Sequence, residues 1–139
     1  MILLDTSGLL SAIDASQRYH TQCAEALSSA LPPLLLSPFV LAELDYLLAR
    51  RVGAAAQTVL LDEVARGVYQ LEPFGQADVA AAKGVLDRYP KLHIGLADAS
   101  LVVLAERHRT RDVLTLDERH FRALRTRDRR RFRILPLDR

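Results

Sequence analysis

The chain has 139 residues, of which 50% are hydrophobic and 26% charged, a composition typical of one globular domain spanning residues 1–139. Its single cysteine excludes an intramolecular disulfide, and no apolar stretch approaches the roughly 20 residues that a membrane span needs. The N-terminus lacks a basic segment ahead of its apolar residues, which argues against a secretory signal. We therefore expect a cytoplasmic protein without a membrane partner.

The net charge of +2 hides an uneven distribution along the chain. Residues 1–100 carry 7 Lys or Arg against 11 Asp or Glu, whereas residues 101–139 carry 12 against 6. Arginine binds phosphate through two parallel hydrogen bonds. The basic end therefore indicates a polyanionic partner. An alternative is that these arginines form a solvated face or pair with nearby acids.

Short apolar segments alternate with longer segments of helical pattern. We expect strands at 2–4, 34–36, 68–71, 112–115 and 133–136. We expect helices at 7–12, 17–30, 38–51, 54–66, 76–89, 96–108 and 117–124. Ser37 and Pro38 have the residue types of an N-cap and a first helical position. Strands alternating with helices predict a parallel sheet with helices on both faces.

Two acids directly follow predicted strands. Asp5 comes after the apolar run 2–4, and Asp117 follows the run 112–115. Ligands of open α/β sheets bind just outside the carboxyl ends of the strands, so both positions suit a functional acid. Aspartate is also a favoured helix N-cap, and capping is a sufficient explanation for each residue taken alone.

Two further acids lie on predicted helices beside apolar residues. At about 100° per residue, Glu43 falls within the apolar arc of its helix, whereas Asp45 points to the opposite, solvated side. A carboxylate on a core-facing stripe is costly unless it is paired or binds a metal. We favour the metal over an ion pair with a buried arginine or a position at the exposed end of the arc. Asp98 shares a face with Leu101 and Val102, although the helix dipole alone favours an acid in a first turn.

Together, these four acids are expected to converge on one crevice. Clustered carboxylates repel one another, so the group makes sense chiefly around a hard cation such as Mg²⁺ or Mn²⁺. One or two such ions can activate water and stabilise the attacking and leaving oxygens at a phosphodiester. No His/Cys spacing indicates zinc, no glycine-rich loop is suited to phosphates, and no serine has a nucleophile-elbow context.

Four short motifs stand in order along nearly the whole chain: LDTS at 4–7, LAEL at 41–44, LADA at 96–99 and TLDERHF at 115–121. In this order and spacing they resemble the PIN-domain family, and specifically the VapC toxins of bacterial toxin–antitoxin pairs. The resemblance implies a three-layer α/β/α sandwich with a central parallel five-stranded sheet. It also implies endoribonuclease activity, with Mg²⁺ or Mn²⁺ held by residues that match Asp5, Glu43, Asp98 and Asp117.

The same resemblance suggests supporting residues and partners. Thr6, Ser7 and Thr115 match small hydroxyl positions that help to order a ligand or a metal-bound water. The implied partners are a second copy of the chain in a homodimer, a cognate VapB-type antitoxin whose C-terminal segment covers the groove, and an RNA substrate. His120, next to these motif acids, is either a supporting residue of the site or merely exposed.

Three assignments stay open at this level. Asp112 is an alternative to Asp117, although it precedes its strand and would lie at the wrong end. His93 precedes the 96–108 helix and is more simply a loop histidine than a substrate contact. The run 127–131 (RDRRR) is the best candidate for contact with the RNA backbone, which would make affinity fall steeply with salt.

Two rival functions use the same scaffold. A non-catalytic RNA- or protein-binding module would be expected to lose acids, and this chain retains all four. A phosphatase-like enzyme with Asp5 as nucleophile would usually need a second acid two residues on, where this chain has Ser7. We therefore favour the metal-dependent nuclease.

Overall fold

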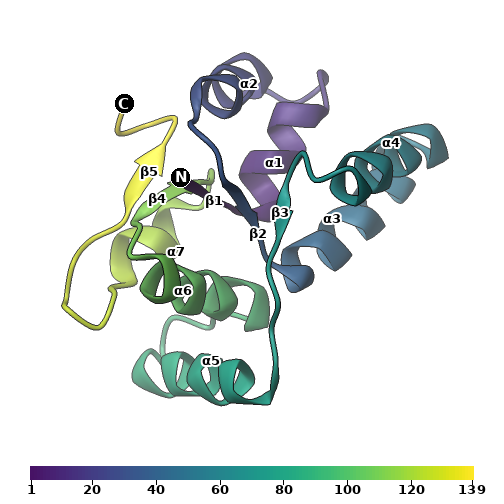
Figure 1. Ribbon diagram of the computed structural model, residues 1–139. Coiled ribbons are helices and arrows are strands. Elements are labelled where there is room, and N and C mark those ends of the chain that lie inside the picture. Colours follow the sequence, from purple (N-terminus) through teal and green to yellow (C-terminus); the bar gives the residue numbers. More distant parts are fainter.

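Five short strands form one parallel sheet in the order β3-β2-β1-β4-β5 (Figure 1). The computed structural model describes residues 1–139. The strands are β1 (Ile2–Leu4), β2 (Leu34–Leu36), β3 (Gln70–Leu71), β4 (Asp112–Leu114) and β5 (Arg133–Leu135). Central strand β1 is buried along its whole length, as expected for a parallel strand covered on both faces.

Seven helices cover the two faces of this sheet. They are α1 (Thr6–Ile13), α2 (His20–Ser29), α3 (Pro38–Arg51), α4 (Ala54–Ala65), α5 (Gln76–Arg88), α6 (Leu96–His108) and α7 (Glu118–Ala123). Helices α1 to α4 gather on one side and α5 to α7 on the other (Figure 1). The predicted three-layer α/β/α arrangement is therefore confirmed. None of the helices combines the length and the apolar character needed to cross a membrane.

Two predicted elements begin two or more residues later than expected. The helix expected at 17–30 begins at His20, because the Asp14 carboxylate accepts hydrogen bonds from the Ser16 backbone N–H (3.0 Å) and the Gln17 amide (3.1 Å) and holds a turn there. The strand expected at 68–71 is reduced to its last two residues. The backbone N–H of Val68 donates to the carbonyl oxygen of Glu63 (3.0 Å). Val68 therefore belongs to the turn that ends α4 and does not pair in the sheet.

The order of the strands creates a switch point between β1 and β4. From β1 the chain adds β2 and then β3 on one side, and it returns to the other side of β1 to add β4 and β5. Ligands of open α/β sheets bind outside the carboxyl ends of the strands at such a point. Asp5 directly follows β1 and Asp117 lies shortly after β4, so both acids stand at this position.

A buried serine pair joins the helices that carry the other two acids. Ser37 Oγ lies 2.7 Å from Ser100 Oγ, and Ser100 Oγ donates to the carbonyl oxygen of Ala97 (2.6 Å). Ser37 also accepts from the backbone N–H of Phe39 (3.2 Å), which confirms the predicted cap of α3. The start of α3 is thereby fixed against the first turn of α6.

Gly8 allows α1 to pack directly on the end of β4. A Cβ added at this position would lie 2.4 Å from the carbonyl oxygen of Leu114 and 2.5 Å from its carbonyl carbon. Both atoms belong to the backbone of the sheet and cannot rotate away. The close approach is therefore possible only for a residue without a side chain.

We predict that Gly8→Ala lowers the free energy of unfolding by about 2 kcal/mol or more, because α1 must move away from β4. Gly84 in α5 is the matched control, since an added Cβ there meets nothing within 4 Å. Gly84→Ala should instead stabilise the chain by roughly 0.5–1 kcal/mol through helix propensity. Urea denaturation of the two variants measures both effects, and equal stability of the two would contradict this packing.

Candidate metal centre

A pocket of about 440 Å³ opens at the carboxyl ends of β1 and β4. Its lining comes from α1, α3, α6 and the start of α7, elements that are far apart in the sequence. The acids that line it are Asp5, Glu43, Asp98 and Asp117. Thr6, Ser7 and His120 line it as well. The structure therefore brings the four acids expected from the sequence into one pocket.

Two hydroxyl groups fix the Asp5 carboxylate at the base of this pocket. Asp5 Oδ2 accepts hydrogen bonds from Thr115 Oγ1 (2.6 Å) and from Ser7 Oγ (3.1 Å), and the two hydroxyls lie 3.2 Å apart. The backbone N–H groups of Leu116 (3.0 Å) and Asp117 (2.9 Å) donate to the same two hydroxyls. This network connects the end of β1 to the end of β4. Thr115 itself is fully buried.

Asp5 and Asp117, the two acids that follow strands, differ in whether the side chain caps a helix. Asp5 occupies the N-cap position of α1, but its side chain makes no capping hydrogen bond, so capping is the wrong interpretation there. Asp117 does cap α7, because its Oδ1 accepts the backbone N–H of His120 at 3.1 Å. Its second oxygen remains directed to the pocket side, where it meets the imidazole of the same histidine.

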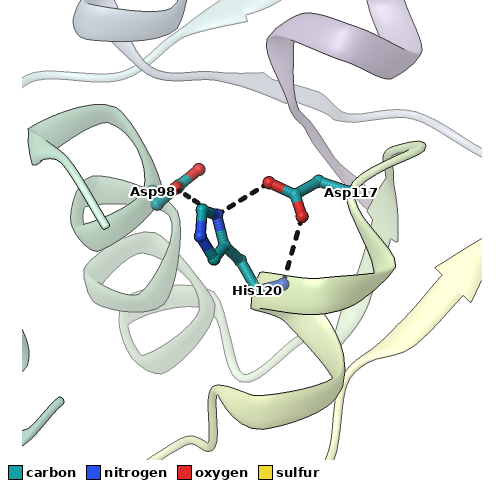
Figure 2. Close-up of side chains that lie close together, drawn as sticks. All are labelled: Asp98, Asp117 and His120. Carbon is teal, nitrogen blue, oxygen red and sulfur yellow. Dashed lines mark hydrogen bonds and ion pairs between the residues drawn. The ribbon is translucent and has the colours of Figure 1, made fainter. Parts of the chain in front are cut away.

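The His120 ring lies between two carboxylates (Figure 2). Its Nδ1 is 2.7 Å from Asp117 Oδ2 and 3.2 Å from Asp98 Oδ2. One ligand atom from each of the three residues lies within 4.8 Å of the others, a spacing compatible with a shared metal ion. His120 is therefore part of the site rather than merely exposed.

Glu43 lies at the exposed rim of the pocket, so the prediction that it lies on the core-facing stripe of α3 is wrong and the alternative of an exposed position is correct. The buried residues of this helix recur every four positions, at Val40, Leu44 and Leu48. Glu43 stands beside this stripe on the side of the pocket. Asp45, expected to be solvated, is half-buried and accepts a hydrogen bond from Gln57 (2.7 Å).

Burial and mutual repulsion act on the ionisation of the acids. Burial raises the pKa of Asp5, and the hydrogen bonds from Thr115 and Ser7 only partly oppose this effect. Burial also raises the pKa of Asp98 to about 7, with a further contribution from the negative charge of Asp5. The positive influence of His120 acts in the opposite direction. The metal-free pocket thus disfavours the ionised forms of Asp5 and Asp98.

One buried polar atom of the pocket, Thr6 Oγ1, has no partner at all. His120 Nδ1 is in contact with the carboxylates of Asp117 and Asp98 and is therefore not an orphan. Buried polar atoms are nearly always satisfied, so the free Thr6 hydroxyl indicates a polar ligand. Carboxylate oxygens are the preferred ligands of hard divalent cations. The donor set therefore fits a divalent metal ion.

Arg51 is a pocket residue that the sequence analysis missed. It is the one arginine or lysine of the lining, and Gln17 contributes an amide on another wall. Glu43, Leu47 and Arg51 recur every four residues and all line the pocket. Projecting α3 in steps of four from Glu43 would have identified this face.

The structure also places the three open assignments. Asp112 begins β4 and pairs with Arg133 (3.1 Å) at the opposite end of that strand, which excludes it from the pocket. His93 is exposed and does not line the pocket. The run 127–131 is absent from the lining as well.

Comparison with known proteins assigns this geometry to a family. The family model described as PIN domain matches residues 2–138. This chain belongs to the PIN-domain family. Ribonuclease VapC26 of Mycobacterium tuberculosis is 44% identical over 135 residues, which cover 97% of this chain and 100% of that protein. The relationship places the chain with the VapC-type members.

Solved structures share the PIN fold. Mycobacterium tuberculosis VapC20, described as a sarcin-ricin loop cleaving toxin, matches with a TM-score of 0.78 at 22% identity, covering 84% of this chain and 90% of that one. FitAcB of Neisseria gonorrhoeae matches with a TM-score of 0.53 at 22% identity, over 78% and 83% of the two chains. VapBC2 of Rickettsia felis, bound to promoter DNA, matches with a TM-score of 0.56 at 20% identity, covering 78% of this chain and 83% of that one. The predicted PIN-like α/β fold is confirmed.

We predict that Asp98→Asn stabilises the metal-free protein near and above neutral pH. The pKa of Asp98 is raised from 3.8 to about 7 in the folded chain, so the folded state holds a proton that the unfolded state has lost. Stability therefore falls as the pH rises through this window. Asparagine does not ionise, and the variant should gain roughly 1–3 kcal/mol above the raised pKa.

Thermal melts in excess EDTA at several pH values measure this gain, which should shrink as the pH falls toward the pKa of an ordinary aspartate. Asp62→Asn is the control, because Asp62 forms an exposed pair with Arg66 on α4. That substitution should change the melting temperature little at any pH. A gain for Asp98→Asn that is independent of pH, or a loss at alkaline pH, would contradict the electrostatic origin.

Proposed function

We propose that this chain is a metal-dependent endoribonuclease and the toxin component of a type II toxin–antitoxin pair. The observation that carries the proposal is the convergence of Asp5, Glu43, Asp98 and Asp117 on a pocket that also contains the unpartnered hydroxyl of Thr6. The identity to a VapC ribonuclease over the whole chain supports the same activity.

We assign the metal ligands to the four acids, with one or two ions of Mg²⁺ or Mn²⁺. The hard carboxylate oxygens of the pocket favour these ions over zinc. When bound, the metal supplies a nucleophilic water at neutral pH and neutralises charge on the scissile phosphate. Without it, the excess of negative charge in the pocket would repel an RNA phosphate.

The chain's own residues hold this site in place before the substrate arrives. Thr115 and Ser7 both donate to Oδ2 of Asp5, which fixes the plane of the carboxylate. His120 restrains the side chain of Asp117 from two directions, through its backbone N–H and through its ring. The unpartnered hydroxyl of Thr6 has a free hydrogen-bonding capacity for a water or a phosphate oxygen at the same site.

The partners of the chain belong to the same proposal. A cognate VapB-type antitoxin is supported by the structural neighbours, which include VapBC2 and FitAB assemblies. We also propose a homodimer and a cytoplasmic location, as the family resemblance implies. RNA is the proposed substrate, and the bond broken is a phosphodiester between nucleotides.

We predict that Asp5→Asn abolishes metal-dependent cleavage of a structured RNA pool. Asparagine has the size of aspartate, so the fold should survive while the charge is lost. Cleavage by the wild type should need Mg²⁺ or Mn²⁺, should stop in EDTA and should fall by about a hundredfold or more in the variant. Equal cleavage by the two proteins would indicate a contaminant or another site.

No cleavage by either protein, together with no metal binding in titration calorimetry, would favour the rival non-catalytic binding module. A trapped phospho-aspartate on Asp5 would instead favour the phosphatase-like reaction. Each of these outcomes contradicts the ribonuclease proposal.

Glu43→Gln tests whether the exposed rim acid takes part. We predict a loss of about tenfold or more in metal affinity and in cleavage, since one carboxylate ligand is removed. Asp45→Asn is the matched control on the same helix, because Asp45 is held by Gln57 and does not line the pocket. Similar metal affinities for the two variants in calorimetry would remove Glu43 from the ligand set.

A further inference from the structure

A second cavity, of about 490 Å³, lies at the opposite end of β4 from the acidic pocket. Arg111 comes just before β4, whereas Asp117 follows it. The cavity is lined by the end of α6, by the turn into β4 and by the loop after α7, and it shares no lining residue with the acidic pocket. Figure 1 shows this loop in yellow, on the side of the molecule away from α3 and α4.

The charged groups of this cavity are predominantly basic. They are Arg109, Arg111, Arg127, Arg130, Glu106 and Asp128. Both acids are already engaged in holding the loop. Glu106 accepts the backbone N–H of Arg127 (3.0 Å), while Asp128 accepts the Thr126 hydroxyl and lies 3.1 Å from Arg130 Nε.

Two guanidinium groups remain without an acidic partner. The Arg109 side chain forms no hydrogen bond or ion pair, and Arg111 donates only to the carbonyl oxygen of Arg131 (3.2 Å). Arg109 also adopts a left-handed conformation (φ 53°) at the end of α6, where glycine is the usual residue. A guanidinium is always charged, and its planar donors match the oxygens of a phosphate.

The lining indicates phosphates rather than a peptide as the ligand. Ala105 is its one hydrophobic residue, so the cavity offers nothing to the apolar side chains that anchor protein partners. Three residues of the run 127–131 line this cavity, Arg127, Asp128 and Arg130, so the run supplies only two of its arginines. Arg109 and Arg111 join them from a different part of the chain.

We propose that the cavity around Arg109 and Arg111 is a second binding site for the RNA backbone, remote from the cleaved bond. The proposal rests on the proposed ribonuclease function. Asp98 and Arg109 mark the two ends of α6 and are about 16 Å apart along its axis. A stacked strand rises 3.4 Å per nucleotide, so about five nucleotides separate the two sites. Only an RNA longer than this reaches both.

The test measures binding of labelled mixed-sequence RNA of about 20 and about 4 nucleotides, lengths on either side of this separation, by fluorescence anisotropy in EDTA over a range of salt. The variant is Arg109→Asn/Arg111→Gln, in which asparagine tolerates the left-handed conformation. Arg66→Gln/Arg88→Gln removes the same charge from exposed positions outside both pockets. Circular dichroism checks folding.

We expect the cavity variant to bind the long RNA about tenfold more weakly. The slope of log K against log salt should also become less steep by about 1.4, because two phosphate contacts are lost and each contributes about 0.7. Binding of the short RNA and binding by the control variant should stay at the wild-type level. If the double variant does not fold, Arg127→Gln replaces it, because this side chain is 81% exposed. Its slope should fall by about 0.7.

Several results would overturn the proposal. If the control variant also bound the long RNA more weakly, to the same extent, the effect would come from overall charge alone. If the cavity variant bound the short RNA more weakly to the same extent, the cavity would not be a separate, remote site. If inorganic phosphate stabilised the wild type but the cavity variant bound RNA as tightly as the wild type, the cavity would be a site for free anions and not for RNA. Length-dependent binding through Arg109 in a protein that does not cleave RNA with Mg²⁺ would support this site and overturn the ribonuclease proposal alone.

Discussion

The repulsion among carboxylates gathered at the ends of β1 and β4 is the constraint on which the rest of the site depends. Burial and neighbouring charge raise the pKa values of Asp5 and Asp98, so the metal-free pocket opposes its own ionisation. The hydroxyls of Ser7 and Thr115 and the ring of His120 offset part of this cost. A divalent ion would offset the remainder, so the donor set fits a ligand that the chain itself does not contain.

The fold supplies the stability that this arrangement lacks. A cluster of 29 buried apolar residues extends over both faces of the sheet, and the switch point between β1 and β4 places the acids at its edge. Gly8 brings α1 onto the end of β4, while the pair of Ser37 and Ser100 fixes α3 against α6. Each acid is thus carried by an element whose position is set by packing. Such preorganisation lets charged groups act without rearrangement.

Opposite charges occupy the two ends of β4. The acids follow the strand, and the arginine-lined cavity precedes it, with α6 running between the two regions. The uneven charge of the sequence is therefore also a separation in space. A basic region near an acidic pocket raises the local concentration of a polyanion that the pocket by itself would repel. In the proposed ribonuclease, attraction of the RNA and cleavage are assigned to different surfaces of one chain.

The sequence by itself determined the parallel α/β architecture, most element boundaries to within one residue and the four acids of the pocket. These features depend on local patterns, since an apolar run followed by an acid is readable without knowledge of the fold. Only the tertiary structure decided that Glu43 lies at the rim, because the rotation of α3 about its axis depends on its neighbours. The partner of Asp5 is Thr115, 110 residues away, and the cavity unites Arg109 with Arg127. Such pairings follow from how distant elements pack, which local patterns do not encode.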